Sequence, residues 1–94
     1  VQVDVAAINW RERRLLLGEC KWGAEPVGRS VIRELLDEKT PKVREALPDG
    51  GVDWTIDYCF FARNGFTEAA QADAQAVNAT LVDLLALDQG LQRR

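Results

Sequence analysis

Apolar and polar side chains alternate over two stretches near the start of the chain. In residues 1–10 the odd-numbered positions from Val1 to Ala7 are all apolar and share one face. Residues 14–22 alternate in the same way with a more apolar composition, and residues 11–13 between them are polar. Because a period of two is typical of β-strands, this pattern predicts two strands that form a hairpin.

Helical periodicity follows the hairpin. Four apolar residues recur at the spacing of one helix face: Val31, Ile32, Leu35 and Leu36. Proline lacks a backbone N–H group and disfavours a helical conformation in the residue before it, so the Thr40-Pro41 pair is expected to interrupt or kink this helix. Residues 41–47 are compatible with a short helical continuation.

The second half of the chain predicts a strand, a helix and another strand. Residues 52–62 are rich in aromatic and β-branched side chains, which is typical of a buried central strand. Thr67 suits the N-cap of a helix whose inner face holds several alanines, and these permit close packing on a sheet. We interpret residues 79–83 as a short strand that leads into a helix, in preference to one continued helix, and residues 89–94 as a frayed tail.

Length and composition limit the fold and the chemistry. The chain has 94 residues, which is enough for one domain with one hydrophobic core. Hydrophobic residues make up 47% and charged residues 29%, as in ordinary globular proteins, so the chain is expected to fold. The sequence contains no histidine, which excludes Ser-His-Asp and Cys-His catalysis and histidine-bound zinc from its own residues.

Net charge and the placement of the cysteines limit the binding partners and the cellular compartment to be expected for the protein. The net charge of −3 provides no global basic field for nucleic acid or an anionic membrane. Cys20 and Cys59 lie in strand-like segments without the spacing of a metal or redox motif, so we expect buried thiols. The longest nearly apolar run, residues 81–87, is much shorter than the roughly 20 residues of a membrane span. We expect a soluble, cytoplasmic protein without a membrane segment.

The predicted hairpin carries the candidate catalytic groups. Glu19 and Lys21 are two residues apart on one strand, so their side chains share a face. A hairpin loop of two or four residues would set Asp4 opposite Glu19, with Cβ atoms about 4.5–5.5 Å apart. A loop of three residues would turn Asp4 to the other face unless a bulge restored the register.

Two carboxylates at opposite positions repel each other, and a divalent cation would relieve that repulsion. Carboxylate oxygens suit Mg²⁺ or Mn²⁺, which keep several waters and can activate one of them as a nucleophile. Lys21 could orient that water or stabilise charge on a phosphate. Asp4, Glu19 and Lys21 therefore suggest phosphodiester hydrolysis, with Asp4 and Glu19 as metal ligands. The alternative is a solvated polar surface with a weak ion pair.

Three further residues have two interpretations each. Arg29 and Arg33 lie one helical turn apart, and they either contact phosphates or form an exposed charged helix face. Trp22 points to the face opposite Lys21, where we favour packing in the core over stacking on a base.

Asp4 and the Glu19-Cys20-Lys21 strand resemble the D…(D/E)-x-K signature of the PD-(D/E)xK nuclease superfamily. Over nearly the whole chain, four segments resemble the nuclease-like C-terminal domain of archaeal-type DEXX-box ATPases: V-Q-V-D-V-A-A, G-E-C-K-W, P-V-G-R-S-V-I-R-E-L and F-F-A-R-N-G-F-T-E-A-A. The resemblance implies an α/β fold with a restriction-endonuclease-like core, in which a mixed sheet is flanked by helices. It also implies metal ligands at Asp4 and Glu19 and a catalytic lysine at Lys21.

The chain departs from the pattern of this family at two places. An acidic residue often lies two positions before the aspartate, where this chain has Gln2, so one supporting ligand would be absent. The core of the superfamily also begins with a helix and a first strand, whereas this chain begins at Val1 with the hairpin. We expect residues 1–94 to form a single nuclease-like domain that lacks this N-terminal part.

Two functions follow from the residues and the resemblance. The first is a Mg²⁺- or Mn²⁺-dependent DNA endonuclease domain of a larger protein, for which the resemblance implies an ATPase domain upstream in the same polypeptide. No G-x-x-x-x-G-K-[ST] phosphate loop occurs in these 94 residues, so they are not expected to hydrolyse ATP themselves. The second is a catalytically inactive nuclease fold that binds DNA, regulates an ATPase or forms a homodimer. Gln2 and the acidic composition favour the second function, whereas the intact Asp4, Glu19 and Lys21 favour the first.

Overall fold

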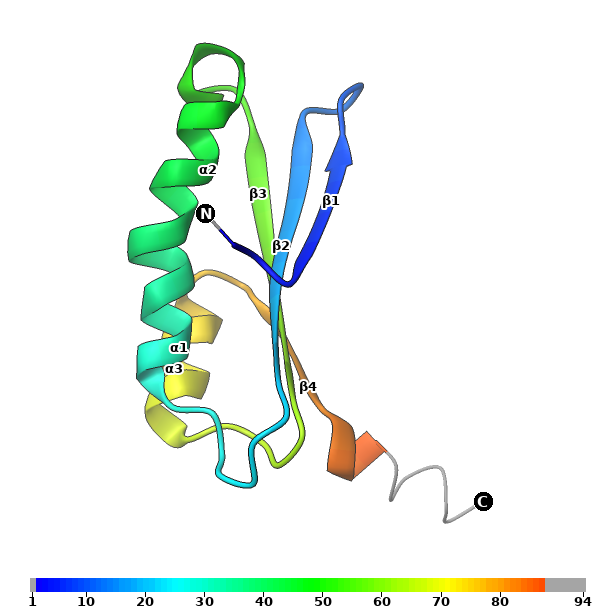
Figure 1. Cartoon of the computed structure of the whole chain (residues 1–94), viewed down its shortest axis with the longest axis vertical. Helices are drawn as coiled ribbons and strands as arrows, with labels where there is room; N and C mark the ends of the chain where they lie inside the picture. The colour runs from blue at the N-terminus through cyan, green and yellow to red at the C-terminus, as the bar shows by residue number, and fades with distance from the viewer. Residues whose placement is uncertain (1, 88–94) are drawn as a thin grey trace.

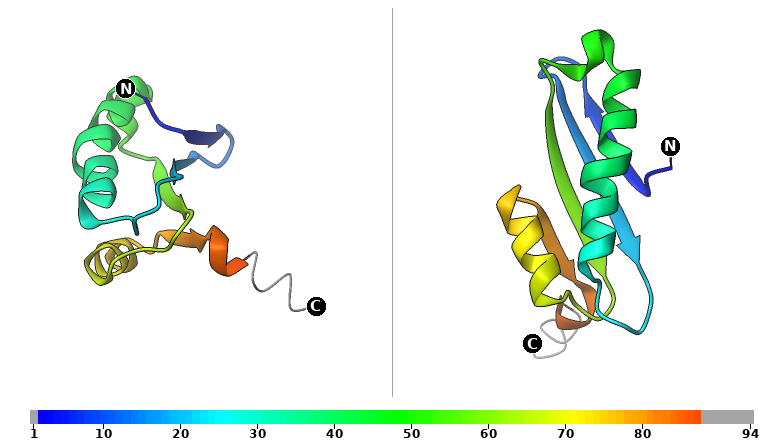
Figure 2. Two further views of the ribbon diagram at one scale, coloured as in Figure 1. Left: turned by 60° about the horizontal axis from the view of Figure 1, so that its bottom comes forward. Right: turned by 90° about the vertical axis from the view of Figure 1, so that its left-hand side faces the viewer.

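A mixed four-stranded sheet forms the centre of the fold. The computed structural model describes residues 2–87, so Val1 and the predicted tail lie outside the described part. The strand order is β1 (Val5–Asn9), β2 (Arg14–Lys21), β3 (Thr55–Ala62) and β4 (Thr80–Asp83) (Figure 1). β1 runs antiparallel to β2, whereas β2, β3 and β4 are parallel. The helices gather on one face of the sheet (Figure 2). An α/β fold with a mixed sheet flanked by helices is thus confirmed.

The β1–β2 hairpin has the register that a four-residue loop requires. Val5 pairs with Gly18, and Asn9 pairs with Arg14. Residues 10–13 form the loop, in which the Glu12 N–H group donates a hydrogen bond of 3.0 Å to Asn9 Oδ1. β1 begins only at Val5, so the predicted strand over residues 1–10 was too long. The chain bends at the residue before Val5.

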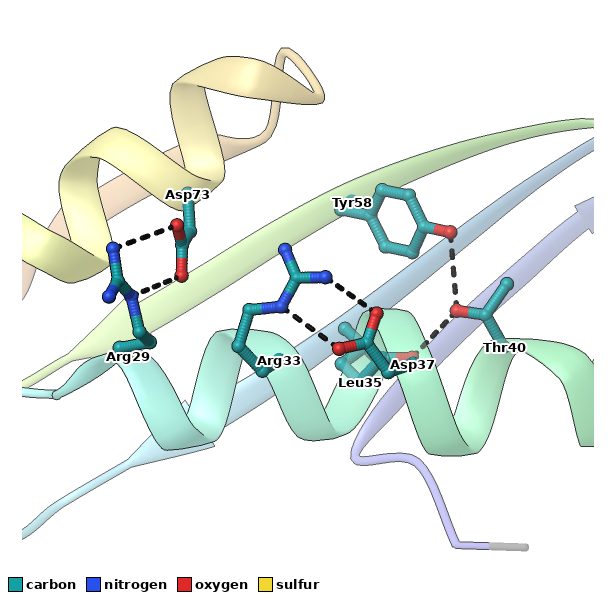
Figure 3. Close-up of polar contacts among 7 residues, drawn as sticks. All are labelled: Arg29, Arg33, Leu35, Asp37, Thr40, Tyr58 and Asp73. Atoms are coloured by element: carbon teal, nitrogen blue, oxygen red, sulfur yellow. Dashed lines mark hydrogen bonds and ion pairs between the residues drawn. The ribbon is translucent and has the colours of Figure 1, made fainter.

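One continuous helical segment connects β2 to β3. It consists of α1 (Arg29–Arg33), the π-helical η1 (Glu34–Lys39) and α2 (Thr40–Ala46). The helix continues past Pro41, which lies in the first turn of α2, where a missing N–H group does little harm. The turn before the proline is widened, because the N–H group and the hydroxyl group of Thr40 both donate to the Leu35 carbonyl, the hydroxyl at 2.7 Å (Figure 3).

The predicted elements of the second half are present. After a 3₁₀ turn, η2 (Pro48–Gly51), β3 runs between β2 and β4 as the expected inner strand. α3 (Glu68–Ala76) begins after Thr67, whose hydroxyl accepts a hydrogen bond of 3.1 Å from the Ala70 N–H group and confirms the N-cap. β4 confirms the preferred strand, and a helical turn follows it at residues 84–87.

The hydrophobic core lies between the sheet and the helices. Its buried members are Leu15, Leu17, Ile32, Leu35, Leu47, Trp54, Phe60 and Ala70. Trp22, just beyond the end of β2, is 67% exposed, so the prediction that it packs in the core was wrong. The physical reason is that the helices cover only one face of the sheet (Figure 2). Both cysteines are free thiols: Cys59 is buried as expected, but Cys20 is only half-buried.

No helix within residues 2–87 is long and apolar enough to cross a membrane.

Candidate functional site

Asp4 and Glu19 lie opposite each other at the point where β1 begins. The last strand pair is Val5 with Gly18, and one more step in the same register sets Asp4 against Glu19. Asp4 Oδ2 accepts a hydrogen bond of 3.0 Å from the N–H group of Cys20. A backbone N–H group at a sheet edge needs an acceptor, and here a side chain takes the place of a strand carbonyl. This bond fixes the Asp4 carboxylate next to Glu19.

Glu19 is buried and forms an ion pair with a lysine on the helical segment. The Glu19 side chain is 4% exposed, because it points from β2 toward the helix layer. Lys39 Nζ donates a hydrogen bond of 2.5 Å to Glu19 Oε1, and the Lys39 side chain is 21% exposed. A buried carboxylate requires a partner of opposite charge. Lys39 supplies that charge.

Sequence reasoning missed Lys39. The signal that could have identified it is its place four residues after Leu35, on the apolar face of the helix. A lysine at such a position faces the core and needs a carboxylate partner there. No local pattern indicates that this partner is Glu19, because the two residues meet only when the helix packs on the sheet.

The groups around Asp4 stabilise its ionised form. The hydrogen bond from the N–H group of Cys20 is the largest influence that lowers the pKa of Asp4. Partial desolvation opposes it, and the positive charges of Lys21 and Lys39 add smaller downward shifts. The Asp4 carboxylate therefore stays ionised to a lower pH than an ordinary aspartate.

The pKa of Lys39 shifts in the complementary direction. The hydrogen bond with Glu19 raises the pKa of Lys39 most strongly, desolvation opposes it, and the charges of Glu19, Glu34 and Asp4 add to the increase. Glu34 Oε1 lies 3.9 Å from Lys39 Nζ. Lys39 is thus an ammonium group held among three carboxylates.

Lys21 is exposed at the last position of β2. Strand alternation puts it on the same face as Glu19, and its charge acts on Asp4. The structure therefore brings the three residues of the proposed catalytic set into one neighbourhood and adds Lys39 to it.

The two arginines predicted to contact phosphates each hold a carboxylate. Arg29 Nε donates to Asp73 Oδ2 at 2.8 Å and joins α1 to α3, while Arg33 donates to both oxygens of Asp37 at 2.9 and 2.7 Å (Figure 3). Each guanidinium group is paired with a carboxylate through Nε and Nη2, which weakens its attraction for a phosphate. Their role in phosphate binding stays a prediction.

The carboxylate pair fits a hydrated cation in an open site. Asp4 Oδ2 accepts a hydrogen bond from the Cys20 N–H group and Glu19 Oε1 accepts one from Lys39, so a cation at this pair would have to bind beside these donors or displace them. Within residues 2–87 no three His, Cys, Asp or Glu side chains are grouped as metal ligands. Mg²⁺ commonly takes one or two carboxylates and keeps several waters. The residues present therefore fit Mg²⁺ or Mn²⁺ but do not form a closed cage.

Comparisons of the chain with protein-family models, with curated proteins and with solved structures find no match. The resemblance to PD-(D/E)xK nucleases therefore depends on the motifs and their spacing.

Proposed function

We propose that this chain is a metal-dependent DNA endonuclease-type domain that hydrolyses phosphodiester bonds. The observation that carries the proposal is the opposition of Asp4 and Glu19 beside Lys21 in one hairpin. The proposal includes a restriction-endonuclease-like core, a cytoplasmic location and an ATPase domain in the same polypeptide. DNA is the proposed substrate, and a homodimer would offer one site to each strand.

Each residue of the set has a task in this reaction. Mg²⁺ or Mn²⁺ at the two carboxylates would neutralise phosphate charge and activate a water for attack. Asp4, kept ionised by the Cys20 N–H group, contributes an oxygen at the exposed side of the site. Glu19 contributes an oxygen from the buried side, where packing limits its rotation. Lys21 is exposed at the end of β2, from where it could donate to a phosphate oxygen of DNA.

A second candidate function is favoured by the Lys39–Glu19 ion pair. Lys39 neutralises Glu19 without a metal, so the repulsion between the two carboxylates does not by itself require a divalent cation. Under this alternative the domain keeps the nuclease fold without catalysis. It would then bind DNA, regulate an ATPase or mediate dimerisation.

Plasmid nicking in the presence of Mg²⁺ or Mn²⁺ tests the first function. We expect the wild-type protein to nick supercoiled DNA, and Asp4→Ala and Lys21→Ala to lower the rate by on the order of 100-fold or more. Asp53→Ala and Lys42→Ala are controls that make the same charge changes at exposed positions. Asp53 lies between η2 and β3, and Lys42 lies in α2. Equal nicking by the wild type and both site variants would refute the catalytic assignment. Metal-independent DNA binding without nicking would favour the second function.

A further inference from the structure

We infer that Lys39 and a divalent cation are alternative counter-ions of Glu19, so that the site takes up metal only when Lys39 moves from Glu19 to Glu34. The inference depends on the proposed function, since it concerns the metal centre formed by Asp4 and Glu19. It assigns Lys39 a regulatory role at that centre.

The burial of Glu19 is the first argument. With 4% of its side chain exposed, Glu19 has little access to water, so a cation must accompany its charge in every state of the site. Lys39 Nζ takes that place at 2.5 Å from Oε1. A metal ion bound at the same carboxylate would bring a second positive charge within a few ångströms of the ammonium group. Since like charges at that distance repel strongly in a partly buried site, the two cations exclude each other.

The second argument is that Lys39 has another partner within reach. Glu34 Oε1 lies 3.9 Å from Lys39 Nζ, and the Glu34 side chain is 53% exposed. A lysine side chain has four flexible methylene groups, so a small rotation carries its ammonium group from one carboxylate to the other. Lys39 therefore leaves Glu19 without losing an ionic partner.

The π-helical geometry of η1 explains why Glu34 lies close to Lys39. Glu34 and Lys39 are the first and last residues of η1 and are five positions apart. Residues five apart are separated on the surface of an α-helix but lie one above the other in a π-helical turn, whose hydrogen bonds join residues five apart. The widened turn thus places one lysine between a buried acid on β2 and an exposed acid on its own helix.

Heteronuclear NMR of the unaltered protein tests the displacement directly. Without metal, we expect a coupling across the hydrogen bond between Lys39 ¹⁵Nζ and the Glu19 ¹³C carboxyl carbon. Saturating Mg²⁺ should abolish this coupling and shift the Glu34 carboxyl signal. A coupling that persists in saturating Mg²⁺ would overturn the inference, because Lys39 would then remain on Glu19 in the metal-bound state.

Mn²⁺ titration calorimetry of variants tests the energetic consequence. Lys39→Gln keeps a hydrogen-bond donor but removes the charge, and we expect it to increase Mn²⁺ affinity by about tenfold or more. Lys42→Gln makes the same charge change at an exposed position of α2 and should alter the affinity by less than about threefold. Equal affinities of wild type and Lys39→Gln would overturn the inference and leave the metal centre intact.

A double-mutant cycle separates displacement from simple charge effects. Glu34→Gln should weaken Mn²⁺ binding in the wild type, because Lys39 loses its second partner, and should have a much smaller effect when Lys39 is already Gln. The same effect in both backgrounds would contradict the move of Lys39 to Glu34. Glu19→Gln reports on the centre itself. If neither wild type nor Lys39→Gln binds Mn²⁺ in a Glu19-dependent way, the proposed metal function and the inference fail together.

Discussion

Replacing Gly18 by alanine should weaken the sheet beside the candidate site, because the added methyl group has no room between β1 and β3. A Cβ atom at this position would lie 2.5 Å from Cys59 Sγ, 3.0 Å from the Cys59 carbonyl oxygen and 3.2 Å from Val5 Cβ. The Cys59 side chain is buried, and the other two atoms move only with their strands. Both neighbouring strands must therefore shift.

The expected loss of stability follows from these distances. Overpacking of a well-packed site costs about 1–3 kcal/mol, and the contact below 3.0 Å indicates a value of about 2 kcal/mol. For a domain of this size, such a loss lowers Tm by about 8–16 °C. Because Glu19 follows Gly18 directly, the same shift should also disturb the alignment of Asp4 with Glu19.

Thermal denaturation followed by circular dichroism measures this effect. Gly23→Ala is the matched control, since no atom lies within 4 Å of its added Cβ, and it should change stability by less than about 0.5 kcal/mol. Adding Cys59→Ala to Gly18→Ala removes the sulfur and should restore part of the loss. A Gly18→Ala protein with the Tm of the wild type would refute the close approach of β3 to β2 at this position.

Three further predictions concern the ion pair, the helix cap and the thiols. Lys39→Met should lower the free energy of unfolding in urea by about 3 kcal/mol, since it leaves Glu19 buried without a partner. The control Lys42→Met should leave the free energy of unfolding nearly unchanged. Similar losses in the two variants would count against a buried ion pair. Thr67→Ala should lower the free energy of unfolding by about 1 kcal/mol through the lost N-cap, and an unchanged urea midpoint would argue against that cap. Cys20 should react with a thiol reagent at pH 8 before Cys59, because burial raises the pKa of Cys59 and lowers its thiolate fraction; faster modification of Cys59 would contradict its burial.

Much of the fold could be predicted because it is encoded locally. Alternation between residues 14 and 22 specified β2, and the hydroxyl of Thr67 marked the start of α3. The length of β1 could not be predicted in the same way, because its start depends on Asp4 bonding to the backbone of β2. Trp22 was misplaced since alternation assigns a residue to a face but does not tell whether another layer covers that face.

The residues of the candidate site also differ in whether local sequence patterns could predict that they meet. Asp4, Glu19 and Lys21 belong to one hairpin, so strand periodicity and loop length were enough to suggest that they meet. Lys39 comes from a helix whose approach to the sheet depends on packing of the whole core. Arg29 similarly meets Asp73, 44 residues away, in a pairing that no local pattern indicates. The sequence thus indicated the two carboxylates of the candidate site but not the lysine that forms an ion pair with one of them.

The central claim is that Asp4 and Glu19 form a divalent metal centre, and crystallography with bound Mn²⁺ tests it most directly. We expect an anomalous difference peak within about 2.0–2.6 Å of a carboxylate oxygen from each residue, with the ammonium group of Lys39 beside Glu34. An Asp4→Asn crystal treated in the same way should have no such peak. Saturating Mn²⁺ that leaves no peak at the wild-type carboxylates, with Lys39 still bonded to Glu19, would contradict the metal centre.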